Sequence, residues 1–273
     1  NPALAWQCLG GFVMFVFSGL YMARRHLREV LRKAVFNDPS IDDSEEIMPH
    51  RRSVVVFALS LATMWIFLTK MGMTLAIGGT LIAILLILYI GVTRFVIEGG
   101  LVLCRPSAPA IVAVIALFGA QSMPIASLAA LVACTVFVND LKAGYMPAFA
   151  NSIKLLGAER LSRSAILKAG LYALAFGSVA SLALMFWFCY DIGASQAKPW
   201  LLHTGGRTYA SSLVASLHSV PTPDGSRIFW GGAGMAAMLI LTLCRYNFAW
   251  WPIHPIGFPI APTWGVQMSM GSI

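Results

Sequence analysis

The chain alternates long apolar stretches with short polar segments, and the apolar stretches have the length of membrane-spanning helices. An α-helix of about 20 residues crosses the roughly 30 Å hydrocarbon layer of a bilayer. Stretches without Asp, Glu, Lys or Arg therefore predict spans at about residues 3–23, 53–69, 72–93, 107–121, 123–138, 169–190 and 228–245. We expect an all-α fold, in which residues 1–273 form a single polytopic transmembrane helical bundle.

One apolar window, residues 106–139, is too long for a single span and is interrupted at residues 121–124. Pro124 lacks a backbone donor and disfavours helix in the residue before it. The window therefore predicts a helical hairpin with two short arms, and hence a bundle with broken or re-entrant segments. Its length leaves open whether the first arm crosses the membrane or re-enters.

Lys and Arg are concentrated in segments 24–52 and 139–168. Cytoplasmic loops of membrane proteins carry this excess of basic residues. We therefore expect a cytoplasmic loop at 24–52 and an extracytoplasmic loop at 191–227, and the hairpin must then begin and end on the cytoplasmic side.

The composition agrees with a lipid environment, because 58% of the residues are hydrophobic and only 11% are charged. Soluble domains carry about 25% charged residues. The net charge of +8 follows from the loop bias, so we expect the lipid bilayer as a partner and no nucleic acid. The five cysteines and five histidines show no metal-ligand spacing. We expect no metal, no cofactor and, without a nucleophile–base pattern, no enzyme.

Residues 26–35 predict an amphipathic helix after the first span. Apolar residues recur there at helical spacing, with basic residues between them: Leu27, Val30, Leu31, Ala34 and Val35. This pattern is typical of a helix in the interface of an anionic leaflet. The acidic run at 42–46 is interpreted as a solvated loop that partly neutralises the helix.

The segment from Arg94 to Gly100 has two interpretations. Arg94 and Glu98 stand four residues apart and can pair on one helix face, and Gly99 and Gly100 then weaken the helix. A carboxylate beside a helix break is how discontinuous helices present ion or substrate sites. The alternative is an interfacial ion pair that caps the cytoplasmic end of the helix.

Three further polar residues are candidates for the same kind of site. Asp140 is either a buried ionisable group facing a polar cavity or a helix-end residue paired with a nearby Lys. Asn151 ends a segment that is apolar enough to dip back into the protein. His254 lies in the proline-rich stretch 250–262, which is either irregular backbone buried in the protein or an aromatic anchor at the membrane interface.

Several motifs together resemble one family. They are Ala5 to Gly11, Arg24 to Arg28, Asp42 to Ser44, Arg94 to Gly100, Met146 to Ala148 with Asn151, and Trp251 to Gly257. The chain is similar to the C-terminal portion of an uncharacterised bacterial family related to the oligopeptide transporter (OPT) superfamily. OPT proteins are longer, so the resemblance implies a fragment whose partners are the rest of the polypeptide or other membrane subunits.

The resemblance implies a secondary transporter in the bacterial inner membrane. OPT transporters move small peptides or metal chelates, commonly with protons. The candidate site for substrate or ion is then formed by Arg94, Glu98, Gly99, Gly100, Asp140, Asn151 and His254. The alternative function is a structural or accessory transmembrane subunit of a larger complex, without transport activity.

Overall fold

The computed structural model describes residues 2–38, 41–43, 46–100, 106–138, 144–156, 163–193, 211, 214, 224–248 and 250–261. Within this part of the chain it contains 10 α-helices and one π-helical turn (Cys189–Gly193). The predicted all-α fold is confirmed. Most of the predicted loop 191–227 and all of residues 139–143, including Asp140, lie outside the described residues.

Among the described residues, five helices are long and apolar enough to cross a membrane. They are α1 (Pro2–Met22), α3 (His50–Lys70), α4 (Leu75–Gly99), α8 (Arg163–Phe188) and α10 (Gly225–Asn247). Several extend past the apolar windows that predicted them, because long basic side chains such as Lys168 can reach polar surroundings while their backbone stays helical. These five helices correspond to the five charge-free stretches that each predict one span.

Five shorter helices connect or cover the long ones. They are α2 (Arg24–Phe36), α5 (Ala110–Phe118), α6 (Ile125–Val138), α7 (Tyr145–Leu156) and α11 (Gly257–Ile260). The amphipathic helix predicted at 26–35 is present as α2.

The window 106–139 forms two short helices, α5 and α6, with the predicted interruption between them. At about 1.5 Å per residue, α5 is about 14 Å long and α6 about 21 Å, so neither crosses about 30 Å of hydrocarbon by itself. The predicted spans at 107–121 and 123–138 thus contain helices shorter than a full span, and whether the first arm crosses stays a prediction. Ser127, fully buried near the start of α6, accepts a hydrogen bond from the Thr74 amide (3.0 Å) and donates one to the Gly72 carbonyl (3.2 Å). These bonds hold the tip of the broken segment against the turn between α3 and α4.

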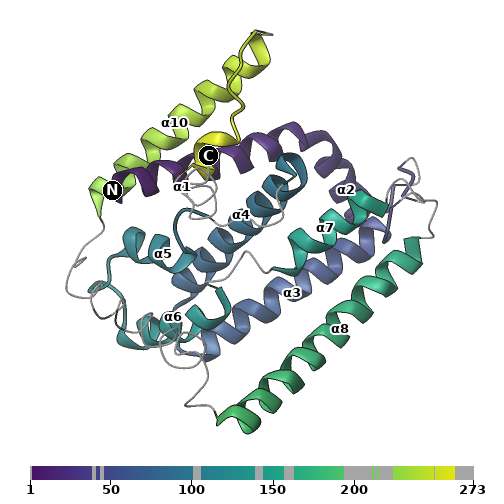
Figure 1. Cartoon of the computed structure of the whole chain (residues 1–273). Helices are drawn as coiled ribbons and strands as arrows, with labels where there is room; N and C mark the ends of the chain where they lie inside the picture. Colours follow the sequence, from purple (N-terminus) through teal and green to yellow (C-terminus); the bar gives the residue numbers. More distant parts are fainter. Residues whose placement is uncertain are drawn as a thin grey trace.

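The core is built around α4, which runs through the middle of the bundle between α1 and α3 (Figure 1). Phe12 and Phe95 are fully buried where α1 meets α4, with their ring centroids 4.9 Å apart. Gly91 makes this approach possible, because a side chain there would overlap the ring of Phe12. By contrast, α8 stands apart from the core and contacts mainly α7, so its large apolar side chains are exposed (Figure 1).

Three long helices, α1, α4 and α10, run in the same direction. Gly10 lies against Gly231 in the first halves of α1 and α10, and Tyr246 contacts Met22 near their ends. Arg94, late in α4, contacts the second half of α1. The C-terminal ends of the three helices therefore lie together, as the predicted alternation of spans requires. Which side of the membrane this end faces stays a prediction.

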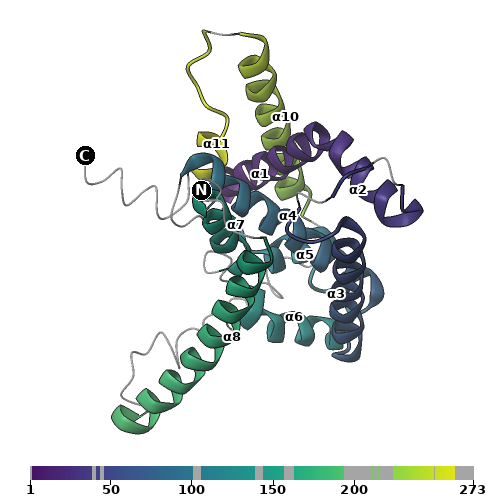
Figure 2. The ribbon, with the colours of Figure 1, turned by 90° about the vertical axis from the view of Figure 1, so that its right-hand side faces the viewer.

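After α10 the proline-rich segment folds back onto α1. Pro255, Ile256 and Pro259 are buried, and the Cys8 thiol on α1 donates a hydrogen bond to the carbonyl of Phe258 (3.3 Å). Figure 2 shows α11 beside α1, well below the far end of α10. The segment thus has features of both interpretations: Pro255 and Ile256 lie buried before the short helix α11, whereas Trp250 is exposed, as expected of an anchor.

Candidate functional site

A small polar cavity of about 110 Å³ lies where the ends of α1, α4 and α10 meet. Its lining comes from these three helices and from the segment that folds back after α10: Phe15, Ser18, Met22, Arg94, Glu98, Thr242, Arg245, Tyr246, His254 and Pro255. Segments far apart in the sequence therefore place a carboxylate, two guanidinium groups, an imidazole and a phenol around one space.

Arg94 and Glu98 form an ion pair within α4, as their spacing predicts. Atoms Nε and Nη2 of Arg94 both donate to Oε1 of Glu98, at 2.9 and 2.6 Å. The third contact of Arg94 is with α1, where Nη1 donates to the Phe15 carbonyl (2.9 Å) and the guanidinium lies 4.1 Å from the centre of the Phe15 ring. The side chains are 26% and 40% exposed, so the pair lies at the edge of the bundle and remains partly open.

The predicted helix break is present directly after this pair. Helix α4 ends at Gly99, and Gly100 has φ = 64° in the left-handed region, which glycine adopts without strain. The ammonium group of Lys154 on α7 donates to the carbonyl of Ile97 in the last turn. A basic side chain at this position also interacts favourably with the negative end of the helix dipole.

The other side of the cavity is held by the end of α10. Arg245 donates to the carbonyl of Trp251 (3.0 Å), which ties the returning segment to the helix it leaves. The Tyr246 hydroxyl donates to the sulfur of Met22 on α1 (3.0 Å). In the returning segment, Nδ1 of His254 accepts from the amide of Ile256 (3.3 Å). Neutral His254 then carries its proton on Nε2.

The structure brings together three of the predicted site residues, Arg94, Glu98 and His254. Gly99 and Gly100 follow directly as the helix end. Asn151 lies on α7, three residues before Lys154, and does not line the cavity. The prediction for Asp140 concerns a residue outside the described part of the chain.

The sequence reasoning missed Arg245 and Tyr246 as site residues. A signal for them was present, because Arg245 closes the last apolar window and Arg94 closes an earlier one. Residues at the ends of two spans that are predicted to end on the same side of the membrane should lie at the same depth in the bundle.

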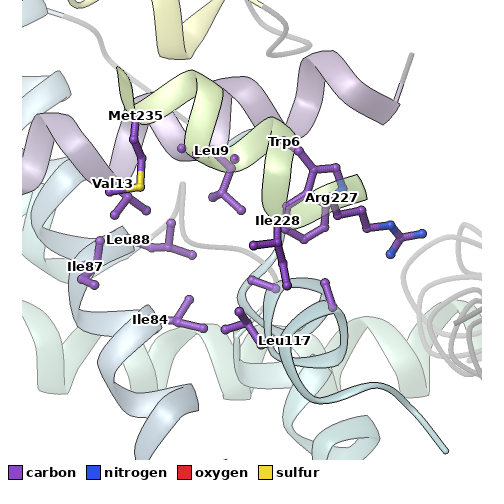
Figure 3. Close-up of a pocket in the computed structure, with 15 residues that line it drawn as sticks. Trp6, Leu9, Val13, Ile84, Ile87, Leu88, Leu117, Arg227, Ile228 and Met235 are labelled. Atoms are coloured by element: carbon purple, nitrogen blue, oxygen red, sulfur yellow. The ribbon is translucent and has the colours of Figure 1, made fainter. Parts of the chain in front are cut away.

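A second cavity, of about 260 Å³, is lined by residues of α1, α4, α5 and α10 (Figure 3). Its walls are apolar side chains such as Leu9, Leu88 and Met235. Arg227 at its rim points its guanidinium away from the space and pairs with Asp224 at 2.8 Å. This cavity therefore suits an apolar group and offers a polar solute no partner.

The described residues contain no group of three or more His, Cys, Asp or Glu side chains that could hold a metal ion. The side chains of Glu98, His254 and Tyr246 give the polar cavity hydrogen-bonding groups, and its two arginines can balance negative charge.

Comparison with known proteins gives a family. No curated protein and no solved structure matches the chain. The resemblance to the OPT superfamily is not supported by these comparisons and stays a prediction. All of residues 1–273 match the model of the Family of unknown function (DUF6785). With five helices able to cross a membrane, the chain is a multi-pass membrane protein and belongs to the DUF6785 family.

Proposed function

We propose that this protein is part of an OPT-like secondary transporter in the bacterial cytoplasmic membrane, which moves a small peptide or metal chelate together with protons. The observation that carries the proposal is the polar cavity at the common end of α1, α4 and α10. There a carboxylate lies beside a helix break and across from a histidine of another segment. Ionisable groups at membrane-spanning helices are rare and commonly mark ion or proton pathways.

Glu98 is the proposed carrier of the coupling proton. Both bonds from Arg94 go to Oε1, so within the described part of the chain Oε2 is the oxygen left for a proton. When Glu98 is ionised, the pair with Arg94 is favourable. Protonation of Glu98 weakens the ion pair, so that Arg94 is then held mainly by its contacts with α1. Proton binding is thereby linked to how firmly α1 and α4 are joined.

The size of the cavity indicates a coupling site more than a solute site. Its 110 Å³ is room for a few water molecules, since each occupies about 30 Å³ in the liquid. A tripeptide does not fit such a space. The solute is therefore expected to bind elsewhere in the full-length protein, with the proton bound here.

The test uses the full-length protein in proteoliposomes that contain a trapped pH-sensitive dye. Trialanine or ferric citrate is applied outside, and proton entry is followed by fluorescence. The wild-type protein should admit protons with at least one of these solutes. Glu98→Gln keeps the shape of the side chain and removes its charge, so it should abolish coupled proton entry.

Glu46→Gln is the matched control, because Glu46 is an exposed carboxylate away from the cavity. It should transport like the wild type. Normal coupled transport by Glu98→Gln would leave Glu98 with the interfacial ion-pair role only. Loss of folded protein in Glu98→Gln, with the control intact, would identify the Arg94–Glu98 pair as structural.

A second function, a structural or accessory subunit of a larger membrane complex, is favoured by the contacts of Arg94. The guanidinium joins Glu98, the Phe15 carbonyl and the Phe15 ring at once, which is an arrangement that stabilises a fold without any transport. Wild-type protein that moves no protons with either solute would favour this function. Under both proposals the chain is not an enzyme.

A further inference from the structure

Helix α2 has an apolar stripe that no other described element covers. Leu27, Leu31 and Val35 lie at i, i+4 and i+8, and they are 40%, 56% and 69% exposed. The side of α2 that carries Val30 and Ala34 is half-buried, and α2 packs there against α3. Helix α2 itself lies at the edge of the bundle (Figure 2), and the exposure of the three side chains places the stripe on its outer side.

A basic cleft lies beside this stripe. It has a volume of about 580 Å³ and is lined by Arg25, Arg28, Glu29 and Arg32 of α2 with Ile41 and Asp42 of the following segment. Arg25, Arg28 and Arg32 recur at i, i+3 and i+7 and share one side of the helix. Arg28 also stands three residues before Leu31 and seven before Val35, so charge and apolar surface adjoin.

Two of the basic side chains in this cleft have no partner in the described part of the chain. Arg32 pairs with Asp38 at 2.9 Å, and Arg24 donates to the Tyr21 carbonyl at 2.8 Å. Arg25 and Arg28 are exposed and form neither an ion pair nor a hydrogen bond with any described residue. Their charges are therefore available to a ligand.

The acidic residues near α2 do not neutralise Arg25 and Arg28 in this arrangement. Asp38 is occupied by Arg32, and a carboxylate oxygen of Asp43 accepts a hydrogen bond from the His50 amide at the start of α3 (3.2 Å). Glu29 and Asp42 also line the cleft, so its lining carries two carboxylates beside the three arginines, and neither carboxylate pairs with Arg25 or Arg28 among the described residues.

The position of α2 relates this surface to the membrane. It begins at Arg24, immediately after the apolar helix α1 ends at Met22. Exposed Tyr21, with the Arg24 guanidinium 4.1 Å from the centre of its ring, is typical of the zone where a span leaves the hydrocarbon. A helix that starts at this level, with apolar and basic sides adjoining, can lie flat in the interface.

We propose that α2 forms a binding site for an anionic phospholipid, in which Arg25 and Arg28 hold the headgroup phosphate while Leu31 and Val35 rest on the acyl chains. This assigns a headgroup site within the helix and is independent of the proposed transport. Arginine suits the role, because its planar guanidinium donates two parallel hydrogen bonds to phosphate oxygens. An anionic leaflet supplies both the phosphate and the apolar layer that the two sides of α2 require.

Native mass spectrometry of the full-length protein in detergent tests the headgroup site. Phosphatidylglycerol should be retained in preference to phosphatidylcholine. Each Arg near an anionic surface contributes roughly a fivefold factor in affinity, so Arg25→Gln with Arg28→Gln should weaken phosphatidylglycerol binding about 25-fold. Arg51→Gln with Arg52→Gln removes two exposed arginines outside the cleft and should have a much smaller effect. Equal losses in the two double variants would overturn the site and indicate nonspecific charge attraction.

A spin label tests the apolar stripe independently. Leu31→Cys in a cysteine-free background, labelled with a nitroxide and reconstituted with phosphatidylglycerol, should be relaxed more by oxygen than by a water-soluble nickel chelate. Stronger relaxation by nickel would place the stripe in water and contradict the proposal. Shielding from both reagents would show that a protein surface, from another segment or a second copy, covers the stripe in place of lipid.

Discussion

Arg94 joins two helices at the cavity, and it needs a glycine on the facing helix to do so. Its Nη1 reaches the Phe15 carbonyl across the surface of Gly19, and a methyl group on Gly19 would overlap that nitrogen. The overlap involves the end of a flexible side chain, so the guanidinium can move while the backbone stays in place. A change at Gly19 therefore acts on one contact.

Gly19→Ala should displace the Arg94 guanidinium from α1 and destabilise the protein by about 1.5–3 kcal/mol, the usual contribution of a hydrogen bond to a charged group. The measurement is reversible unfolding in mixed detergent micelles. In an Arg94→Met background the guanidinium is already gone, so Gly19→Ala should cost little more. An equal cost of Gly19→Ala in both backgrounds would show that Arg94 is not what the methyl group displaces.

Contacts within one helix could be predicted from the sequence, and contacts between distant residues could not. The pair of Arg94 with Glu98 follows from a spacing of four residues. The bond from Arg94 to Phe15 joins residues 79 apart, and helical periodicity does not indicate which helices become neighbours. His254 was a candidate for its chemistry, but its place beside Glu98 depends on a fold-back that composition does not encode.

Helices α1 and α10 approach so closely that backbone meets backbone. A methyl group on Gly10 would overlap the carbonyl of Gly231, and one on Gly234 would overlap the backbone of Gln7. Small residues allow this approach in membrane proteins, where van der Waals packing replaces the hydrophobic effect as the force between helices. Neither backbone can yield without separating the helices.

Gly10→Ala should therefore destabilise the protein by about 3 kcal/mol or more, because the overlap resembles severe overpacking of a core. The fraction of monodisperse protein after graded heating, followed by fluorescence-detected gel filtration, measures the loss. Gly177→Ala is the control, since a side chain there would meet no atom within 4 Å. It should leave stability unchanged or raise it by up to about 1 kcal/mol, the helix propensity difference. Similar losses from both substitutions would contradict the close contact.

Helices long enough to cross a membrane were easier to predict than the short helices α5 and α6. Charge-free windows gave the five long helices, because a helix that crosses lipid must exclude charge over its whole length. The same rule overestimated α5 and α6, since a segment buried among other helices is just as free of charge. Pro124 placed the break correctly but did not indicate that α5 already ends at Phe118.

For the molecule as a whole, the common direction of α1, α4 and α10 agrees with the predicted membrane topology, which can be tested. Residues 24–52 and 139–168 should share the cytoplasmic side, and 191–227 should lie opposite. Single cysteines at positions Ser44, Ser152 and Ser212 in a cysteine-free background test this with a membrane-impermeant thiol reagent applied to intact cells. Only position 212 should react before the cells are permeabilised. Labelling of positions 44 and 212 from the same side would overturn the span count.

The close contact between the first halves of α1 and α10 has a mechanical consequence at their C-terminal ends. Beyond Gly10 the two helices separate, and a groove opens between them lined by residues such as Phe17, Leu243 and Tyr246. The part of α1 from Gly10 to Met22 is about 18 Å long, and it can rotate about the contact at Gly10. A rotation of about 10° around this contact would move the far end of α1 by about 3 Å, while Gly10 and Gly231 stay in register. A displacement of that size is enough to break the bond between Tyr246 and Met22, which both line the polar cavity.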